Sequence, residues 1–283
     1  MLSIGQHLFL HGKSPAIVFL ETAKEIRSLF SVPIIVTNAA FIAGPHNDSI
    51  LIDQKKIKEI NETIHNGYFL WHGSYTDIFT VPEFDKATAA IERILQKELP
   101  VVQETNSRLV IHIGPYLFTD IGQKEMAHFL NEHAQIPHEC PIIYFEMTSS
   151  KKWMQAMGNR ENIIKYLLKI FEELGPRQRK TIGFCIDTAH MWANGFDMRK
   201  QSDVSELLSN FIGIPIAFHL NDSELPMGVG RDQHTEIGQG QIWKDDDGWK
   251  EVINFARKYN CPIILERADI KNEYELVNAY ISD

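Results

Sequence analysis

The sequence predicts an α/β fold, a closed (β/α)8 TIM barrel, and three observations support this prediction. Short apolar runs alternate eight times with stretches of helical periodicity. Most of these runs are rich in Ile, Val and Phe, as expected for strands that are buried on both faces. With 283 residues, 44% of them hydrophobic, the chain can bury one large core, and TIM barrels commonly have this length. We therefore expect residues 1–283 to form a single barrel domain.

The boundaries of the elements follow from the same pattern. The expected strands are residues 2–7, 32–38, 67–72, 108–113, 142–146, 182–187, 214–219 and 262–266. The clearest helical stretches between them are residues 14–30, 53–66, 83–99, 161–175 and 249–259. A last helix over residues 272–281 should pack the C-terminus against the outside of the barrel. No linker, fixed-period repeat or low-complexity segment divides the chain.

Composition narrows the classes of function. No run reaches the roughly 18 apolar residues of a membrane span, and the N-terminal residues lack the basic segment of a signal peptide. We expect a soluble intracellular protein without a membrane partner, and the sequence does not distinguish cytoplasm from nucleus. The net charge of −9 argues against a plain nucleic-acid binder, although bound divalent metal ions would offset part of it.

The chain has three cysteines, and they form no CxxC pair. Cys140, Cys185 and Cys261 each lie in or beside an apolar run, which indicates buried, reduced thiols. The alternative is a catalytic or metal-binding cysteine.

The C-terminal ends of the expected strands carry residue types that bind metals. In a TIM barrel these ends meet at the face where catalysis takes place. The last six ends are all His, Asp or Glu: His72, His112, Glu146, Asp187, His219 and Glu266. Imidazole and carboxylate groups together favour zinc or manganese, and six ligands are too many for one tetrahedral zinc ion. At least two ions are therefore expected, and Glu146 could bridge them.

Two loops extend this set. His190 follows Asp187 by three residues, where the chain turns into the next helix, and Asp232 and His234 form a D-x-H pair after the seventh strand. These three residues could hold a further ion. The alternative is that Asp232 and His234 are solvated loop residues. The glycine-rich segment 237–240 (IGQG) is a weak signal for a backbone that approaches a phosphate.

These motifs resemble those of the endonuclease IV family of apurinic/apyrimidinic (AP) endonucleases, in the xylose isomerase-like TIM barrel superfamily. The matching segments span nearly the whole chain: IGQH (4–7), HGSY (72–75), IHIGP (111–115), FEMT (145–148), FCIDTAHMWANGFD (184–197), FHLNDS (218–223), GRDQHTEIGQG (230–240) and ILER (264–267). The segments around Asp187, His190 and the D-x-H pair are specific when they occur together, whereas IGQH alone would mean little.

The resemblance implies a zinc-dependent enzyme that hydrolyses the phosphodiester 5′ to an abasic site in duplex DNA, as in base excision repair. It implies three Zn²⁺ ions per chain: one held by His72, His112 and Glu146, a second by Glu146, Asp187, His219 and Glu266, and a third by His190, Asp232 and His234. The catalytic residues would be Glu146 and Glu266, with Glu266 orienting or deprotonating the attacking water. Tyr75 and Asn38 are the expected DNA contacts. A monomer is expected, and 3′-phosphodiesterase or 3′–5′ exonuclease activity could accompany the main one.

The chain also departs from the family pattern. The loop after the second strand, NAAFIAGPH (38–46), lacks the family's basic residue, and EMTSS (146–150) stands where the family has ENTAG. Gln233 replaces the usual Arg between Asp232 and His234, and Thr76 replaces an apolar residue. Loss of basic contacts should weaken phosphate binding and its salt dependence. The alternative function is a metal-dependent sugar isomerase or epimerase of the same superfamily.

Overall fold

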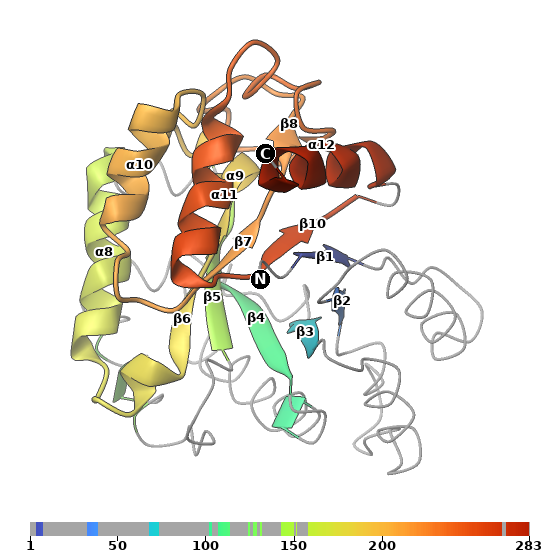
Figure 1. Ribbon diagram of the computed structural model, residues 1–283. Coiled ribbons are helices and arrows are strands. Elements are labelled where there is room, and N and C mark those ends of the chain that lie inside the picture. Colours follow the sequence, from blue (N-terminus) through green and yellow to red (C-terminus); the bar gives the residue numbers. More distant parts are fainter. Residues whose placement is uncertain are drawn as a thin grey trace, which may run out of the picture.

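Eight parallel strands form a closed barrel in the computed structural model, which describes residues 4–7, 33–38, 68–73, 102–103, 107–113, 124, 127–128, 131, 143–149, 151, 158–267 and 270–282 (Figure 1). Around the barrel the order is β1-β10-β7-β6-β5-β4-β3-β2, and β1 pairs with both β10 and β2, which closes the ring. The strands are β1 (Ile4–His7), β2 (Pro33–Asn38), β3 (Tyr68–His72), β4 (Arg108–Ile113), β5 (Ile143–Met147), β6 (Ile182–Asp187), β7 (Ile216–His219) and β10 (Ile263–Leu265). The predicted TIM barrel is confirmed, with every strand boundary within two residues of its expected place.

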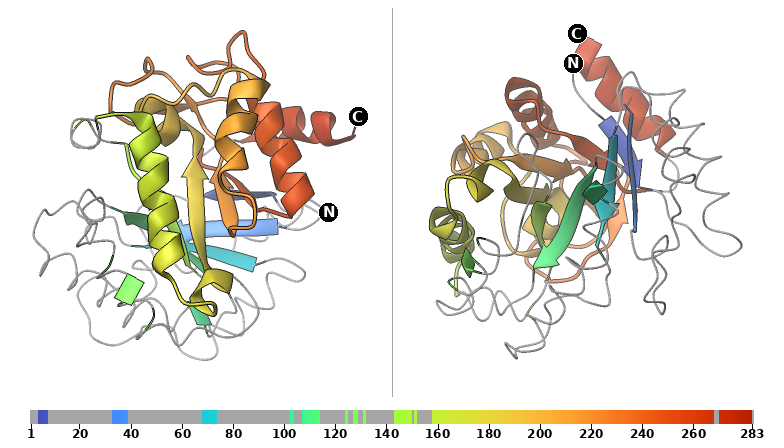
Figure 2. Two further views of the ribbon diagram at one scale, coloured as in Figure 1. Left: turned by 90° about the vertical axis from the view of Figure 1, so that its left-hand side faces the viewer. Right: turned by 90° about the horizontal axis from the view of Figure 1, so that it is seen from below.

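The described helices cover the outside of the strands. They are α8 (Arg160–Glu173), α9 (Thr188–Ala193), α10 (Gln201–Ser209), α11 (Gly248–Tyr259) and α12 (Lys271–Ser282), with a 3-10 turn η3 (Gln178–Lys180). Figure 2 shows α8, α10 and α11 standing side by side along one flank of the barrel. The expected helices over 161–175, 249–259 and 272–281 are confirmed, whereas those over 14–30, 53–66 and 83–99 lie outside the described residues.

Local signals set the helix ends. The side chain of Asn159 accepts a hydrogen bond from the Asn162 N–H over 2.9 Å and so caps the start of α8. Helix α11 ends at Asn260, which adopts the left-handed conformation with φ 55°. Along its length α8 buries an apolar face against the sheet, formed by Ile163, Ile164, Leu167 and Ile170.

Alternation along each strand separates two apolar layers. The larger layer lies between strands and helices, and it includes Trp71, Ile111, Phe145, Ile186, Phe218 and Leu265. The smaller layer fills the barrel interior with one residue from each of six strands: Leu70, Val110, Tyr144, Cys185, Ala217 and Ile264. Because successive side chains of a strand point to opposite faces, the next residue to enter the interior stands two positions further along each strand.

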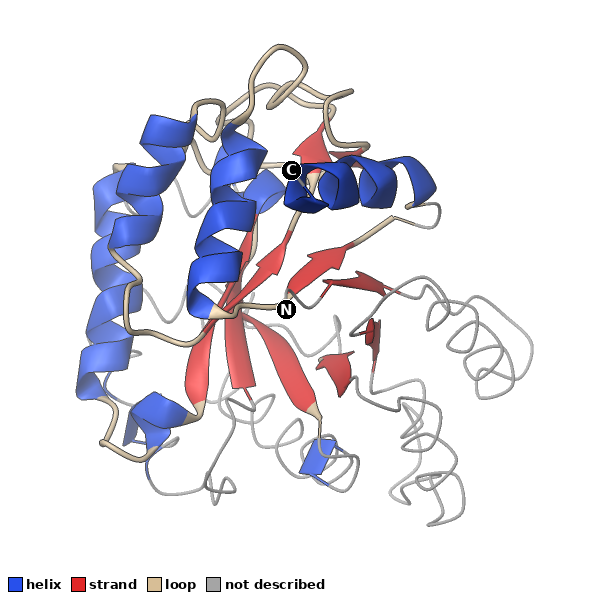
Figure 3. Cartoon of the chain, viewed as in Figure 1, coloured by secondary structure: helices blue, strands red, loops and turns tan. Residues whose placement is uncertain are grey.

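Two smaller features complete the fold. A short antiparallel hairpin, β8 (Asp222–Ser223) and β9 (His234–Thr235), follows β7, and it was not predicted (Figure 3). Cys185 and Cys261 are buried and free, as expected, whereas Cys140 lies outside the described residues. Among the described helices, none combines the length and the apolar character needed to cross a bilayer.

Candidate metal centre

A polar layer lies directly above the apolar interior of the barrel. On each of six strands the residue two positions beyond the interior apolar one is a His, Asp or Glu. These six residues are all buried: His72, His112, Glu146, Asp187, His219 and Glu266. Their side chains therefore converge at the C-terminal ends of the strands, where the sequence places them.

Glu146, at the end of β5, lies at the centre of this layer. Its Oε2 atom is 3.2 Å from Nε2 of His72 and 3.1 Å from Nε2 of His112. Its Oε1 atom is 3.1 Å from Nδ1 of His219 and 3.3 Å from Nδ1 of His190. The two oxygens of one carboxylate thus face two separate groups of imidazoles, which is the geometry of a residue that could bridge two ions.

A second group surrounds the end of β6. Nδ1 of His219 lies 3.2 Å from Oε2 of Glu266 and 3.9 Å from Oδ2 of Asp187. Both carboxylates accept a hydrogen bond from Nδ2 of Asn221, over 2.8 Å to Asp187 and 2.9 Å to Glu266. Asn221 was not singled out from the sequence, although it stands two residues after His219, just beyond the end of β7.

A third group joins helix α9 to the loop after β7. The Asp187 side chain caps α9 by accepting from the His190 N–H over 2.9 Å, which fixes His190 beside it. Nε2 of His190 is 3.3 Å from Oδ2 of Asp232, and Oδ1 of Asp232 is 2.8 Å from Nε2 of His234. Asp232 and His234 therefore contact the buried residues, and they form the rim of the site.

Burial and mutual attraction shift the ionisation of these groups. Burial raises the pKa of Asp187 to about 6. Burial also tends to raise the pKa of Glu146, but the nearby His219 and His112 outweigh this effect. They hold the pKa of Glu146 well below the usual range. At His234 burial lowers the pKa, yet Asp187 and Asp232 raise it to about 9. The pKa values of His190 and His219 are raised as well, so protons on these three imidazoles balance the carboxylates, and a bound metal would displace them.

The chemistry of the donors fits divalent metal ions. Among the described residues, several groups of three side chains bring their ligand atoms within 4.8 Å of one another. Three of these groups are His72, His112 and Glu146; Asp187, His219 and Glu266; and Asp187, His190 and His234. Mixed nitrogen and oxygen donors of this kind suit zinc or manganese. A fourth group includes Cys185, but burial raises the pKa of its thiol to about 12, so it stays protonated and is a poor ligand.

The glycine-rich loop has a different role from phosphate binding. The backbone N–H groups of Gly238, Gly240 and Ile242 donate to the buried carboxylate of Asp222 over 3.0, 3.2 and 3.0 Å. From α12, Glu273 accepts from the Ile237 N–H over 3.2 Å. These amides are engaged inside the protein, so the suggested approach of IGQG to a phosphate is wrong for them.

The two predicted DNA contacts, Asn38 and Tyr75, stand in the sequence at the end of β2 and shortly after the end of β3. The backbone of Asn38 ends β2 and pairs in register with His72, next to the site. Its side chain and the whole of Tyr75 lie outside the described residues.

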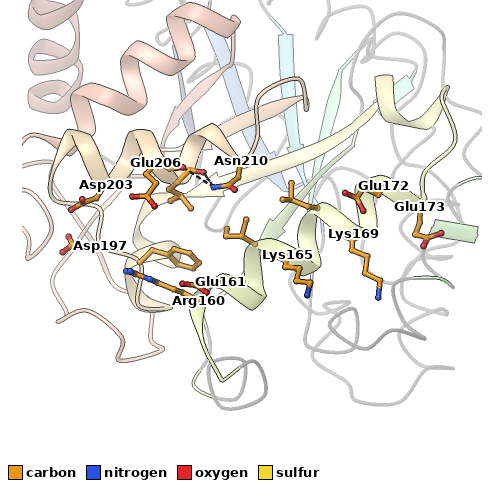
Figure 4. A pocket seen from close by; sticks show the side chains of 14 residues that line it. Arg160, Glu161, Lys165, Lys169, Glu172, Glu173, Asp197, Asp203, Glu206 and Asn210 are labelled. Atoms are coloured by element: carbon orange, nitrogen blue, oxygen red, sulfur yellow. Dashed lines mark hydrogen bonds between the residues drawn. The ribbon is translucent and has the colours of Figure 1, made fainter.

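A cavity of about 870 Å³ lies elsewhere, on the outside of the barrel between α8 and α10 (Figure 4). Ile164, Leu168, Phe196 and Leu207 form its apolar lining, and charged side chains surround them. None of the nine predicted ligands lines this cavity, so it is separate from the metal centre.

Comparison with known sequences identifies a matching family and several named relatives. The family model of the xylose isomerase-like TIM barrel matches residues 39–279. A curated "Probable AP endonuclease" of African swine fever virus is 30% identical over 246 residues, which cover 80% of this chain and 77% of the relative. A "Probable endonuclease 4" of Nitrosopumilus maritimus is 29% identical over 213 residues, which cover 72% and 73%.

Solved structures share the fold at lower identity. The crystal structure of AsfvAP:AG has a TM-score of 0.72 at 24% identity and covers 99% of this chain and 97% of its own. Endonuclease IV from Thermus thermophilus has a TM-score of 0.71 at 19% identity, with 99% of each chain covered. A D-tagatose 3-epimerase-like protein is similar at a TM-score of 0.62 and 16% identity, covering 99% and 97%.

Proposed function

Because the chain belongs to the endonuclease IV family of AP endonucleases, within the xylose isomerase-like TIM barrels, we propose that it is a zinc-dependent AP endonuclease. It hydrolyses the phosphodiester 5′ to an abasic site in duplex DNA, a step of base excision repair, and acts as a monomer. Removal of 3′-blocking groups or 3′–5′ exonuclease activity would use the same centre.

One observation carries this proposal: the two oxygens of Glu146 face two different groups of imidazoles. The arrangement supports a centre with several ions. The first ion would be held by His72, His112 and Glu146, the second by Glu146, Asp187, His219 and Glu266, and the third by His190, Asp232 and His234. When bound, such ions lower the pKa of a water molecule and neutralise charge on phosphate oxygens.

The chain's own residues position the reactants. Glu266 orients the attacking water and accepts its proton at a carboxylate oxygen, while Asn221 holds that carboxylate in place through its 2.9 Å hydrogen bond. Asn38 and Tyr75 contact the DNA, with the aromatic ring of Tyr75 stacking on a base that the abasic site leaves exposed.

A sugar isomerase or epimerase is the second candidate, supported by the likeness to the epimerase-like structure. That likeness shows the fold alone. The group His190, Asp232 and His234 supports the nuclease, since it adds ligands beyond the one or two ions that such epimerases use.

The test is cleavage of a labelled duplex that contains one abasic site. The metal-loaded protein should cut on the 5′ side and leave a 3′-hydroxyl that a DNA polymerase can extend, whereas undamaged duplex stays intact. A chelator should abolish cleavage, and zinc should restore it. If the fully metal-loaded protein leaves the abasic duplex intact but interconverts ketohexoses, the proposal is wrong and the epimerase is correct.

A further inference from the structure

The loop after β7 is fastened to the helix that carries His190. The Gly228 N–H donates to the carbonyl of Trp192 over 3.0 Å, and the Gly230 N–H donates to that of Ala193 over 2.9 Å. Gly228 and Gly230 both have positive φ, at 76° and 62°, which favours glycine at these positions. The chain just before Asp232 therefore has a defined path along α9.

The segment after β5 is fastened to the same helix. Nδ2 of Asn194, at the end of α9, donates to the carbonyl of Thr148 over 3.0 Å. The two segments then meet, because a Cβ atom on Gly230 would lie 2.4 Å from the backbone nitrogen of Lys151 and 2.7 Å from its Cγ atom. Only a glycine at position 230 allows this approach, and it brings Lys151 against the residue that precedes Arg231.

Both basic side chains are exposed and available. Neither Lys151 nor Arg231 forms a hydrogen bond or an ion pair with another residue in the part of the chain that the structure describes. Gln233, by contrast, donates to the carboxylate of Glu224, so its side chain is already engaged. Arg231 precedes Asp232, whose carboxylate contacts His190.

We propose that Lys151 and Arg231 together form a phosphate clamp, which binds a backbone phosphate of the nucleic-acid substrate beside the group His190, Asp232 and His234. This proposal rests on the proposed function for its substrate and names residues that bind it. The clamp supplies local positive charge in a protein whose net charge is −9. Arg and Lys make charge-assisted hydrogen bonds to phosphate oxygens, and the close approach of Gly230 to Lys151 brings together the two segments that carry these cations.

The test measures binding of the metal-loaded protein to undamaged duplex DNA at several salt concentrations, because phosphate contacts do not depend on sequence or damage. Lys151→Gln and Arg231→Gln should each reduce the slope of log affinity against log salt by about 0.9, and the double variant by about 1.8. Arg231→Lys should keep most of the slope, since the charge is retained. For abasic duplex, KM should rise while kcat and metal content stay unchanged, which a merely structural defect would not produce.

Arg257→Gln is the matched control, because it makes the same change of charge on an exposed residue in the last turn of α11. That turn leads into the start of β10, at the opposite end of the barrel from the metal centre. If the Arg231→Gln slope equals those of Arg257→Gln and of the unmodified protein, the clamp is wrong. If the unmodified protein binds duplex with the expected slope changes but never cleaves abasic DNA, the clamp stands and the proposed activity fails.

Discussion

Gly240 lies directly against the carboxylate of Asp222. Its N–H donates to Oδ2 over 3.2 Å, and a Cβ atom at this position would come within 2.3 Å of Oδ1. The glycine is therefore required by close packing around a buried charge, and this packing fixes the loop that follows β9.

Gly240→Ala should consequently destabilise the protein by roughly 1–3 kcal/mol, the usual cost of forcing an extra methyl group into a packed site. Thermal and chemical unfolding measure this. Gly213→Ala is the control. Nothing lies within 4 Å of a Cβ at this position, so the loss of stability comes only from the backbone strain of an alanine at φ +85°. A loss no larger at Gly240 than at Gly213 would show that the loop moves freely away from Asp222.

Asn221 is expected to control metal affinity without contacting the ions. Asn221→Leu keeps a similar shape but removes the donor shared by Asp187 and Glu266, so both carboxylates lose their fixed orientation. Metal affinity, measured by competition with a chromogenic chelator, should fall about 10–100-fold. Asn210→Leu, at the exposed end of α10, should leave the affinity unchanged. Equal affinities for the two variants would remove Asn221 from the metal centre.

The metal centre should hold about three zinc ions per chain, since the three ligand groups each offer at least three protein ligands. Elemental analysis after desalting measures the content. His190→Ala should lose about one ion, because two remaining ligands hold zinc poorly. A reproducible content of one ion or less in the unmodified protein contradicts the proposal of a three-ion centre.

Glu266→Gln separates catalysis from metal binding. The change keeps the shape of the side chain and removes its charge and its basic oxygen, so we predict a rate loss of at least about 100-fold on abasic duplex. Circular dichroism should show retained folding, and the metal content is measured alongside. Turnover near that of the unmodified enzyme, with full metal content, would exclude Glu266 as the proton acceptor.

Glu273 should make the stability depend on pH. Burial raises its pKa from 4.5 to about 7, although Arg267 opposes this. Between these values the folded state keeps a proton that the unfolded state has lost, so the free energy of unfolding falls as the pH rises through this window. Glu273→Gln, which stays neutral, should gain stability relative to the unmodified protein from about pH 5 to about pH 8.

The free energy of unfolding, measured by chemical denaturation at about pH 5 and about pH 8, tests this prediction. Glu275→Gln, at an exposed position on the same helix, is the control. A difference between Glu273→Gln and the unmodified protein that is the same at both pH values would mean that Glu273 is ionised throughout.

The sequence could predict the barrel and the polar layer because both depend on local alternation. His72 and His112 end apolar runs whose boundaries are clear, and the structure places them as expected. The roles of Asp222 and Glu273 could not be predicted in this way. Asp222 depends on residues 238–243 returning to it, and Glu273 lies on a helix where acidic residues are usually solvated. Contacts between distant segments leave no periodic signal, and strands of two residues such as β8 and β9 are too short to show one.

Closure of the barrel has a consequence for the precision of the centre. A strand at the edge of an open sheet can slip by one residue, and such a slip would turn Trp71 inward and His72 outward. Here β1 pairs on both sides, so the ring has no edge, and a slip of any one strand would break its register with two neighbours at once. The relative heights of the ligands along the barrel axis are therefore a collective property of eight strands, and β1 and β2 help to set them although none of the proposed metal ligands lies on either strand.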